Sequence, residues 1–264
     1  MVRPVHRPPR FRLSTPDQLR RRDGTSGGLA QGETPLIPPV NWRTPPARPR
    51  LDDGELHLWR FRLDLPLEAI SDLRPLLSPD ESARAERLRI PSKKLDFIAA
   101  RGRLRQILAR YLDTSPAALR FAYGPAGKPA IAFPESPLAF NLAHAGCWGL
   151  LGICARGGIG VDVEWLKRPV DIGQIAGWAF GEDIRAELDA LPAEIKTRRF
   201  FHLWTTREAR LKALGTGFTE PENAENFELA TGNFLLEDDY PGAWATPSPP
   251  SQISYWHNPS TDSE

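Results

Sequence analysis

Two carboxylates stand two residues apart in the segment 158–165, GIGVDVEW. If this segment is a strand, Asp162 and Glu164 project from one face while the apolar residues occupy the other. Adjacent carboxylates repel each other, and a hard cation such as Mg²⁺, which takes oxygen ligands, relieves that repulsion. The spacing therefore predicts a divalent-cation site, and a polar strand face open to water is the alternative that fits it equally well.

A third carboxylate lies on a predicted helix over residues 195–214. At 100° per residue, Glu208 falls in the apolar sector between Phe201 and Trp204, and Lys212 lies at the edge of that sector. A buried carboxylate needs a cation, a metal or a proton-transfer role. An ion pair between Glu208 and Lys212, four residues apart, is the alternative, but it does not explain why the carboxylate points inward.

A cation occupies the same kind of position on a second predicted helix, over residues 93–112. Arg101 lies in the apolar sector of this helix, with Lys94 and Arg105 on its flank. The planar guanidinium suits phosphate binding, so an inward Arg indicates an anionic ligand or a buried carboxylate partner. A structural ion pair explains the pattern equally well.

These residues need elements to position them, and alternation, periodicity and capping signals predict a mixed α+β chain. Ser78, Pro79 and Glu81 form a capping box that starts a helix, and Gly215 and Gly217 are plausible C-cap glycines. Strands are expected over 55–63, 137–142, 148–155 and 158–165, and a further helix over 182–191. The order predicts two similar α+β halves, 51–155 and 156–235.

Composition bounds the class of protein. The 264 residues are 41% hydrophobic and carry a net charge of +1, which permits a packed core and gives no reason to expect nucleic acid or an acidic membrane as a partner. Cys147 and Cys154 lie in an apolar stretch without metal-ligand spacing, so we expect reduced core thiols and a cytoplasmic protein. No secretion signal or membrane anchor is expected.

Both terminal segments are rich in proline. Residues 1–50 also contain many Arg and Gly, and we expect a disordered arm, although its arginines could contact RNA. Residues 240–264 are Pro/Ser-rich and show no strand-like run, so 236–264 is expected to be an irregular tail. The second half would then lack its closing strands and expose a sheet edge.

Four segments together resemble one enzyme family. GVDVE at 160–164 and WTTREARLK at 204–212 resemble the two signature motifs of Sfp-type 4′-phosphopantetheinyl transferases, and their separation of about forty residues also matches. GKPAI at 127–131 and FNLAHAG at 140–146 resemble two further motifs of that family. No phosphate-binding loop of the form GxxxxGK[ST] is present, so common nucleotide-triphosphate enzymes have little support.

The resemblance implies a pseudo-twofold fold of two α+β halves with coenzyme A bound at their junction. It also implies that a monomer transfers the phosphopantetheine arm of coenzyme A to a serine of an apo acyl or peptidyl carrier protein. The implied Mg²⁺ ligands are Asp162, Glu164 and Glu208. Glu208 would also accept the serine proton and Lys212 would stabilise the leaving group. The implied coenzyme A contacts are Lys128, Pro129, His144, Lys94, Arg101 and Arg105, with Lys93 beside them.

The chain departs from the family pattern at three places. Arg207 stands where the family usually has Lys, and Ala143 replaces the usual Ser before His144. The third departure is the Pro/Ser-rich end, where the family continues with further strands. A non-catalytic protein that binds coenzyme A or a carrier protein, left by loss of those strands, is therefore the alternative function.

Overall fold

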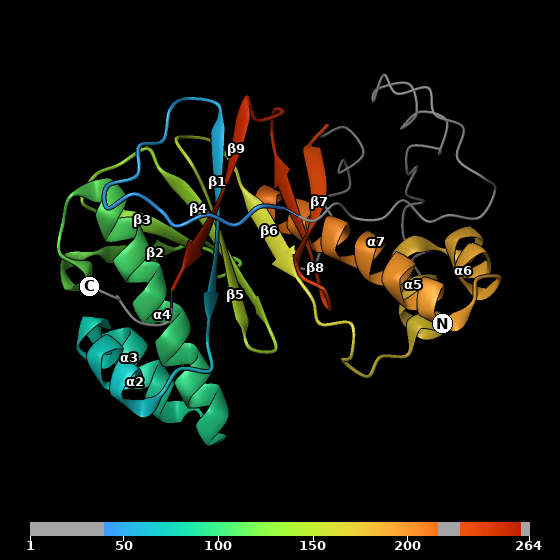
Figure 1. The fold of residues 1–264 in the computed structure, drawn as a ribbon, viewed down its shortest axis with the longest axis horizontal. Coiled ribbons are helices and arrows are strands. Elements are labelled where there is room, and N and C mark those ends of the chain that lie inside the picture. Colours follow the sequence, from blue (N-terminus) through green and yellow to red (C-terminus); the bar gives the residue numbers. More distant parts are fainter. Residues whose placement is uncertain (1–39, 216–227, 260–264) are drawn as a thin grey trace, which may run out of the picture.

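The computed structural model describes residues 40–215 and 228–259. A four-stranded and a three-stranded β-sheet pack face to face, with one long helix against the outer face of each (Figure 1). The predicted α+β class is confirmed. Most of the predicted N-terminal arm, Gly217 and the last residues of the tail lie outside the described residues.

The first part of the chain forms the first sheet and its helices. Its elements are β1 (Glu55–Arg62), α2 (Leu67–Leu73), α3 (Pro79–Arg87), α4 (Pro91–Leu112), β2 (Arg120–Tyr123), β3 (Pro129–Phe133), β4 (Ala139–Ala145) and β5 (Trp148–Cys154). The capping box at Ser78 and Glu81 is present, as predicted. Strands β2 and β3 form a separate hairpin.

The second part of the chain begins at β6 and returns to the first sheet. Its elements are β6 (Gly160–Val163), α5 (Ile172–Phe180), α6 (Glu182–Asp189), α7 (Ala193–Leu214), β7 (Ala230–Glu237), β8 (Tyr240–Thr246) and β9 (Gln252–Asn258). Gly215 follows α7 in the left-handed conformation, with φ of 72°, as expected for a C-cap glycine.

The first sheet has the strand order β4-β5-β1-β9 and buries both of its faces. Strand β5 runs antiparallel to β4 and β1, whereas β9 runs parallel to β1. One face packs against α4 through residues such as Trp59, Phe61 and Leu104. The other face packs against the second sheet, where Leu58 and Leu150 meet Val161 and Phe234 in one apolar cluster.

The second sheet has the order β6-β8-β7 and lies between the first sheet and α7. Successive side chains of β6 alternate between these two neighbours. Val161 and Val163 face the first sheet, and Gly160 and Asp162 lie on the α7 side. Alanines of α7 and β8 keep the layers close, because a small side chain lets the backbones approach.

The prediction of an irregular tail was wrong. Residues 240–246 form β8, which pairs with both β6 and β7, and residues 252–258 form β9 beside β1. Strand β8 is buried on both faces and therefore shows no polar alternation to recognise. The Pro and Ser residues that suggested disorder fall mainly in the turn between the two strands. Strand β8 therefore completes the second sheet, and β9 completes the first.

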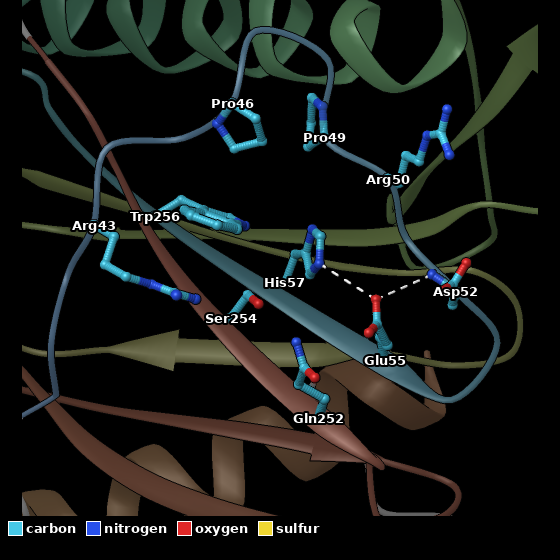
Figure 2. A pocket seen from close by; sticks show the side chains of 10 residues that line it. All are labelled: Arg43, Pro46, Pro49, Arg50, Asp52, Glu55, His57, Gln252, Ser254 and Trp256. Carbon is cyan, nitrogen blue, oxygen red and sulfur yellow. Dashed lines mark hydrogen bonds and ion pairs between the residues drawn. The ribbon is translucent and has the colours of Figure 1, made fainter.

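Residues 40–50, which were also expected to be disordered, run as an extended segment along β9. The Arg43 N–H donates to the Tyr255 carbonyl at 3.0 Å, and the His257 N–H donates to the Arg43 carbonyl at 2.8 Å. Trp42 contacts the ring of Tyr255, with centroids 5.4 Å apart. This segment closes a pocket of about 310 Å³ over β1 and β9, lined by residues including His57 and Trp256 (Figure 2).

None of the sequence-predicted site residues lines that pocket. Both cysteines are free, with Cys154 buried and Cys147 half-buried. Across residues 40–215 and 228–259, no helix has the length and apolar character that crossing a bilayer requires.

Candidate active site

The candidate site lies where β6 crosses α7, and a glycine makes this crossing possible. A Cβ atom at Gly160 would lie 1.9 Å from the Ala209 carbonyl oxygen and 2.4 Å from the Ala213 nitrogen. Both neighbours are main-chain atoms of a helix and cannot move aside. Only glycine lets the strand approach this closely, and the approach brings the carboxylates of β6 beside the side chains of α7.

Asp162 is the most enclosed of the three carboxylates, with 6% of its surface exposed. Its Oδ1 accepts a hydrogen bond from the Lys212 ammonium at 2.6 Å. Its Oδ2 is buried and has no partner. Burial raises the pKa of Asp162, and the Lys212 ammonium only partly opposes this.

Glu164 follows β6 and also contacts α7. The Trp204 indole N–H donates to its Oε1 at 3.0 Å, and Arg168 forms an ion pair with the same oxygen at 3.1 Å. Burial, followed by the negative charge of Asp162, raises the pKa of Glu164 to about 7. Asp162 and Glu164 thus both contact α7, at Lys212 and Trp204, which lie eight residues apart on that helix. That the two carboxylates face one cation site stays a prediction.

Glu208 points inward, as predicted, and is 8% exposed. Burial raises the pKa of Glu208, and the charge of Asp162 raises it further, while Lys212 and Arg207 lower it. The Arg207 guanidinium lies 3.5 Å from the Glu208 carboxylate. Lys212 uses its ammonium for Asp162 on the facing strand. The residues of the two motifs are therefore linked across elements.

The donor set fits a divalent cation in its chemistry. Asp162 carries an orphaned buried oxygen, and its charge disfavours ionisation of both Glu164 and Glu208. A hard cation would satisfy that oxygen and relieve the repulsion. In this conformation, however, no three His, Cys, Asp or Glu side chains within residues 40–215 and 228–259 are close enough to hold a metal ion. The Lys212 ammonium supplies the positive charge at Asp162 instead.

His144, on β4 of the first sheet, lies near the site. His144 is exposed on one side, but the surrounding protein partly removes it from water and so lowers its pKa. The positive charges of Lys93 and Lys212 lower the pKa further, while Asp96 and Asp162 oppose them. His144 is thus within electrostatic reach of α4 on one side and of the β6–α7 crossing on the other. The resemblance puts coenzyme A at the junction of two halves, and a contact of His144 with it stays a prediction.

Lys128 also reaches the crossing, but through main-chain atoms. Its ammonium donates to the carbonyl oxygens of Ile159 at 2.8 Å and Lys212 at 2.6 Å. Pro129, the next residue, begins β3. The hairpin β2–β3 is thereby attached to the strand and the helix that carry the carboxylates.

Arg101 and Arg105 lie elsewhere and have a different partner from the one that the resemblance implied. Their Nε atoms donate to the two carboxylate oxygens of Glu81, at 2.6 and 2.7 Å. Arg105 is fully buried and also donates to the Leu119 carbonyl at 2.9 Å. The structural ion pair is therefore the correct interpretation, because a phosphate would have to displace a buried carboxylate. Lys94 pairs with Glu86 at 2.5 Å, on the neighbouring helix α3.

Two residues support the site in ways that the sequence patterns did not reveal. The Asn141 side-chain oxygen accepts the Val161 N–H at 2.9 Å, which joins β4 to β6. Trp204, interpreted as an apolar core residue, holds Glu164 by its indole N–H. This contact could have been anticipated from the chemistry of Trp204, since a buried Trp N–H usually finds a hydrogen-bond partner.

Comparison with known proteins identifies the family of the chain. A family model described as the 4′-phosphopantetheinyl transferase superfamily matches residues 158–261. The chain is 39% identical over 186 residues to the 4′-phosphopantetheinyl transferase HetI of Nostoc sp., covering 70% of this chain and 78% of HetI. It is 30% identical over 127 residues to the 4′-phosphopantetheinyl transferase Sfp of Bacillus subtilis, covering 48% of this chain and 54% of Sfp. The chain belongs to the 4′-phosphopantetheinyl transferase superfamily.

Proposed function

We propose that this protein transfers the 4′-phosphopantetheine arm of coenzyme A to a serine of an apo acyl or peptidyl carrier protein, a reaction of the holo-[acyl-carrier-protein] synthase type. The supporting observation is the crossing of β6 and α7, where the Lys212 ammonium of one family motif binds Asp162 of the other at 2.6 Å, within electrostatic reach of Glu164 and Glu208.

The proposed reaction is a phosphoryl-type transfer. The carrier serine oxygen forms a bond to the β-phosphorus of coenzyme A, and the bond from that phosphorus to the bridging oxygen breaks, which releases 3′,5′-ADP. Glu208 accepts the serine proton, and the rise in its pKa caused by burial makes the ionised carboxylate a stronger base. Lys212 leaves Asp162 and stabilises the negative charge on the departing 3′,5′-ADP. His144 contacts a phosphate of coenzyme A.

Asp162, Glu164 and Glu208 would hold the Mg²⁺ ion. A bound Mg²⁺ would neutralise charge on the pyrophosphate oxygens. The orphaned oxygen of Asp162 supports this assignment, because a buried carboxylate oxygen without a partner is costly in a protein that binds no cation there.

The structure removes the reason for the alternative function, a non-catalytic binding protein. It depended on absent closing strands, and β8 and β9 are both present. Lys212 of one motif moreover contacts Asp162 of the other. Within the described residues, nothing therefore favours binding without transfer.

The test is substitution of the carboxylates with a matched control. Asp162→Asn and Glu208→Gln keep the side-chain shapes and should each lower the rate of transfer to an apo carrier at least about 100-fold. Asp183→Asn, on exposed α6, should leave the rate unchanged. Intact-mass spectrometry of a panel of apo carriers with coenzyme A and Mg²⁺ measures the gain of the phosphopantetheine mass. Unchanged transfer by both site variants would exclude the assignment.

A further inference from the structure

Lys128 connects three segments that are distant in the sequence. It follows the turn between β2 and β3, and its ammonium donates to the carbonyl oxygens of Ile159, 31 residues away, and Lys212, 84 residues away. The side chain is half-buried, and this burial lowers the pKa of the Lys128 ammonium. Both acceptors are main-chain atoms, so the contacts depend on the backbone path and not on a flexible partner.

The two acceptors lie at the ends of two elements. Helix α7 ends at Leu214, so the Lys212 carbonyl lies in its last turn, where carbonyl groups lose the regular helical donors. The C-terminal end of a helix also carries partial negative charge, which favours a cation there. The Ile159 carbonyl immediately precedes β6. One ammonium therefore satisfies the end of the helix and the start of the strand together.

These acceptors flank the tightest contact of the site. Ile159 is the neighbour of Gly160, whose absent Cβ would collide with Ala209 and Ala213. Lys212 directly precedes Ala213, and its side chain binds Asp162. The Lys128 ammonium thus joins β6 and α7 at the place that sets the distance between the strand carboxylates and the helix residues.

We propose that Lys128 is a positioning residue, which holds β6 against α7 so that Asp162 and Lys212 meet, and that it does so instead of binding a phosphate of coenzyme A. The inference deepens the proposed function and rests on it for its kinetic consequences. Its structural consequence, a fixed crossing in the ligand-free protein, is independent of any substrate.

The first measurement uses the full chain without ligand. Lys128→Met keeps the length and apolar character of the side chain but removes the donor. Amide hydrogen exchange should become faster in β6 and in the last turn of α7, and unchanged in α4. Lys128→Arg, which retains donors, should restore part of the protection. Lys196→Met, which removes a half-buried Lys that pairs with Asp189 near the start of α7, is the control and should leave exchange in β6 unchanged.

The second measurement compares coenzyme A with dephospho-coenzyme A, which lacks the 3′-phosphate. A displaced crossing should lower the transfer rate of Lys128→Met by about tenfold or more with both substrates, because misplaced groups cost rate irrespective of that phosphate. Faster exchange with equal rate losses supports the proposal. Unchanged exchange, or a loss confined to coenzyme A, would overturn it. A wild-type chain that transfers nothing would refute the proposed function while leaving the exchange result interpretable.

Discussion

Asp162, Glu164 and Glu208 all have raised pKa values, and burial is the leading cause in each case. Such an arrangement destabilises the folded protein, since three carboxylates are removed from water near one another, each beside a single cationic side chain. Lys212 offsets this most directly at Asp162, through a contact of 2.6 Å. The charge distribution that suits a cation and a pyrophosphate therefore lowers the stability of the folded protein.

At the same scale, His202 on α7 should make stability depend on pH. Burial, with a smaller contribution from Arg199, lowers the pKa of His202 to about 4. In the unfolded chain a His titrates near about 6.5. Between pH 4 and about pH 6.5 the unfolded state binds more protons than the folded state. The stabilisation that comes from burying a neutral His202 is therefore fully present above about pH 6.5 and is lost as the pH falls toward 4.

We therefore expect His202→Gln to reduce the fall in unfolding free energy between pH 7 and pH 5 by about 1 to 2 kcal/mol. Urea unfolding at both pH values measures this difference. The comparison between variant and wild type removes the contribution of other titrating groups. An identical pH dependence for the two proteins would show that His202 is solvated in the folded state.

At the scale of elements, the distance between β6 and α7 determines whether the site exists. Gly160→Ala should push the strand from the helix, because the new Cβ would meet main-chain atoms at 1.9 and 2.4 Å. We expect a loss of at least about 2 kcal/mol in unfolding free energy. Transfer activity should fall even in the fraction that folds, since Asp162 and Lys212 would separate. Denaturant unfolding and the carrier mass assay measure both effects.

Gly173→Ala provides the control for this prediction. Gly173 lies in α5, and an added Cβ would meet only the Asp171 carboxylate oxygen, at 3.6 Å. Alanine has the higher helix propensity, so this variant should be neutral or slightly stabilising. Equal stability of the Gly160 and Gly173 variants would contradict the close approach of the two elements.

At the scale of the whole molecule, β9, near the end of the chain, completes the sheet to which β1 belongs. Strand β9 pairs with β1 along its length, from Glu55 opposite Gln252 to Phe61 opposite Asn258. Tyr255 also contacts Phe234 of the second sheet, with ring centroids 5.8 Å apart. The two sheets are consequently one folding unit, although their strands are far apart in sequence.

Removal of residues 251–264 should therefore abolish a single cooperative thermal transition, because β1 becomes an edge and the cluster between the sheets opens. A chain that ends at Pro259 keeps β9 and is the comparison. Circular dichroism during heating measures both proteins. A cooperative transition at the same temperature in the shorter chain would show that β9 contributes nothing to the fold.

The sequence by itself determined the elements whose signals are local. The capping box predicted the start of α3, helical periodicity predicted α4 and α7, and the inward direction of Glu208 followed from its angle on α7. The two-residue spacing of Asp162 and Glu164 predicted their common face in the same way. These predictions succeeded because periodicity within one element fixes the direction of a side chain.

Only the tertiary structure determined which partner each inward-facing side chain contacts. The same periodicity that turned Arg101 inward could not distinguish a phosphate from Glu81, which lies 20 residues earlier in the chain. Nor could it show that β8 is covered on both faces, or that Lys128 binds main-chain carbonyls. Partners and coverage depend on how distant segments cross, and a pattern read along one segment does not contain that information.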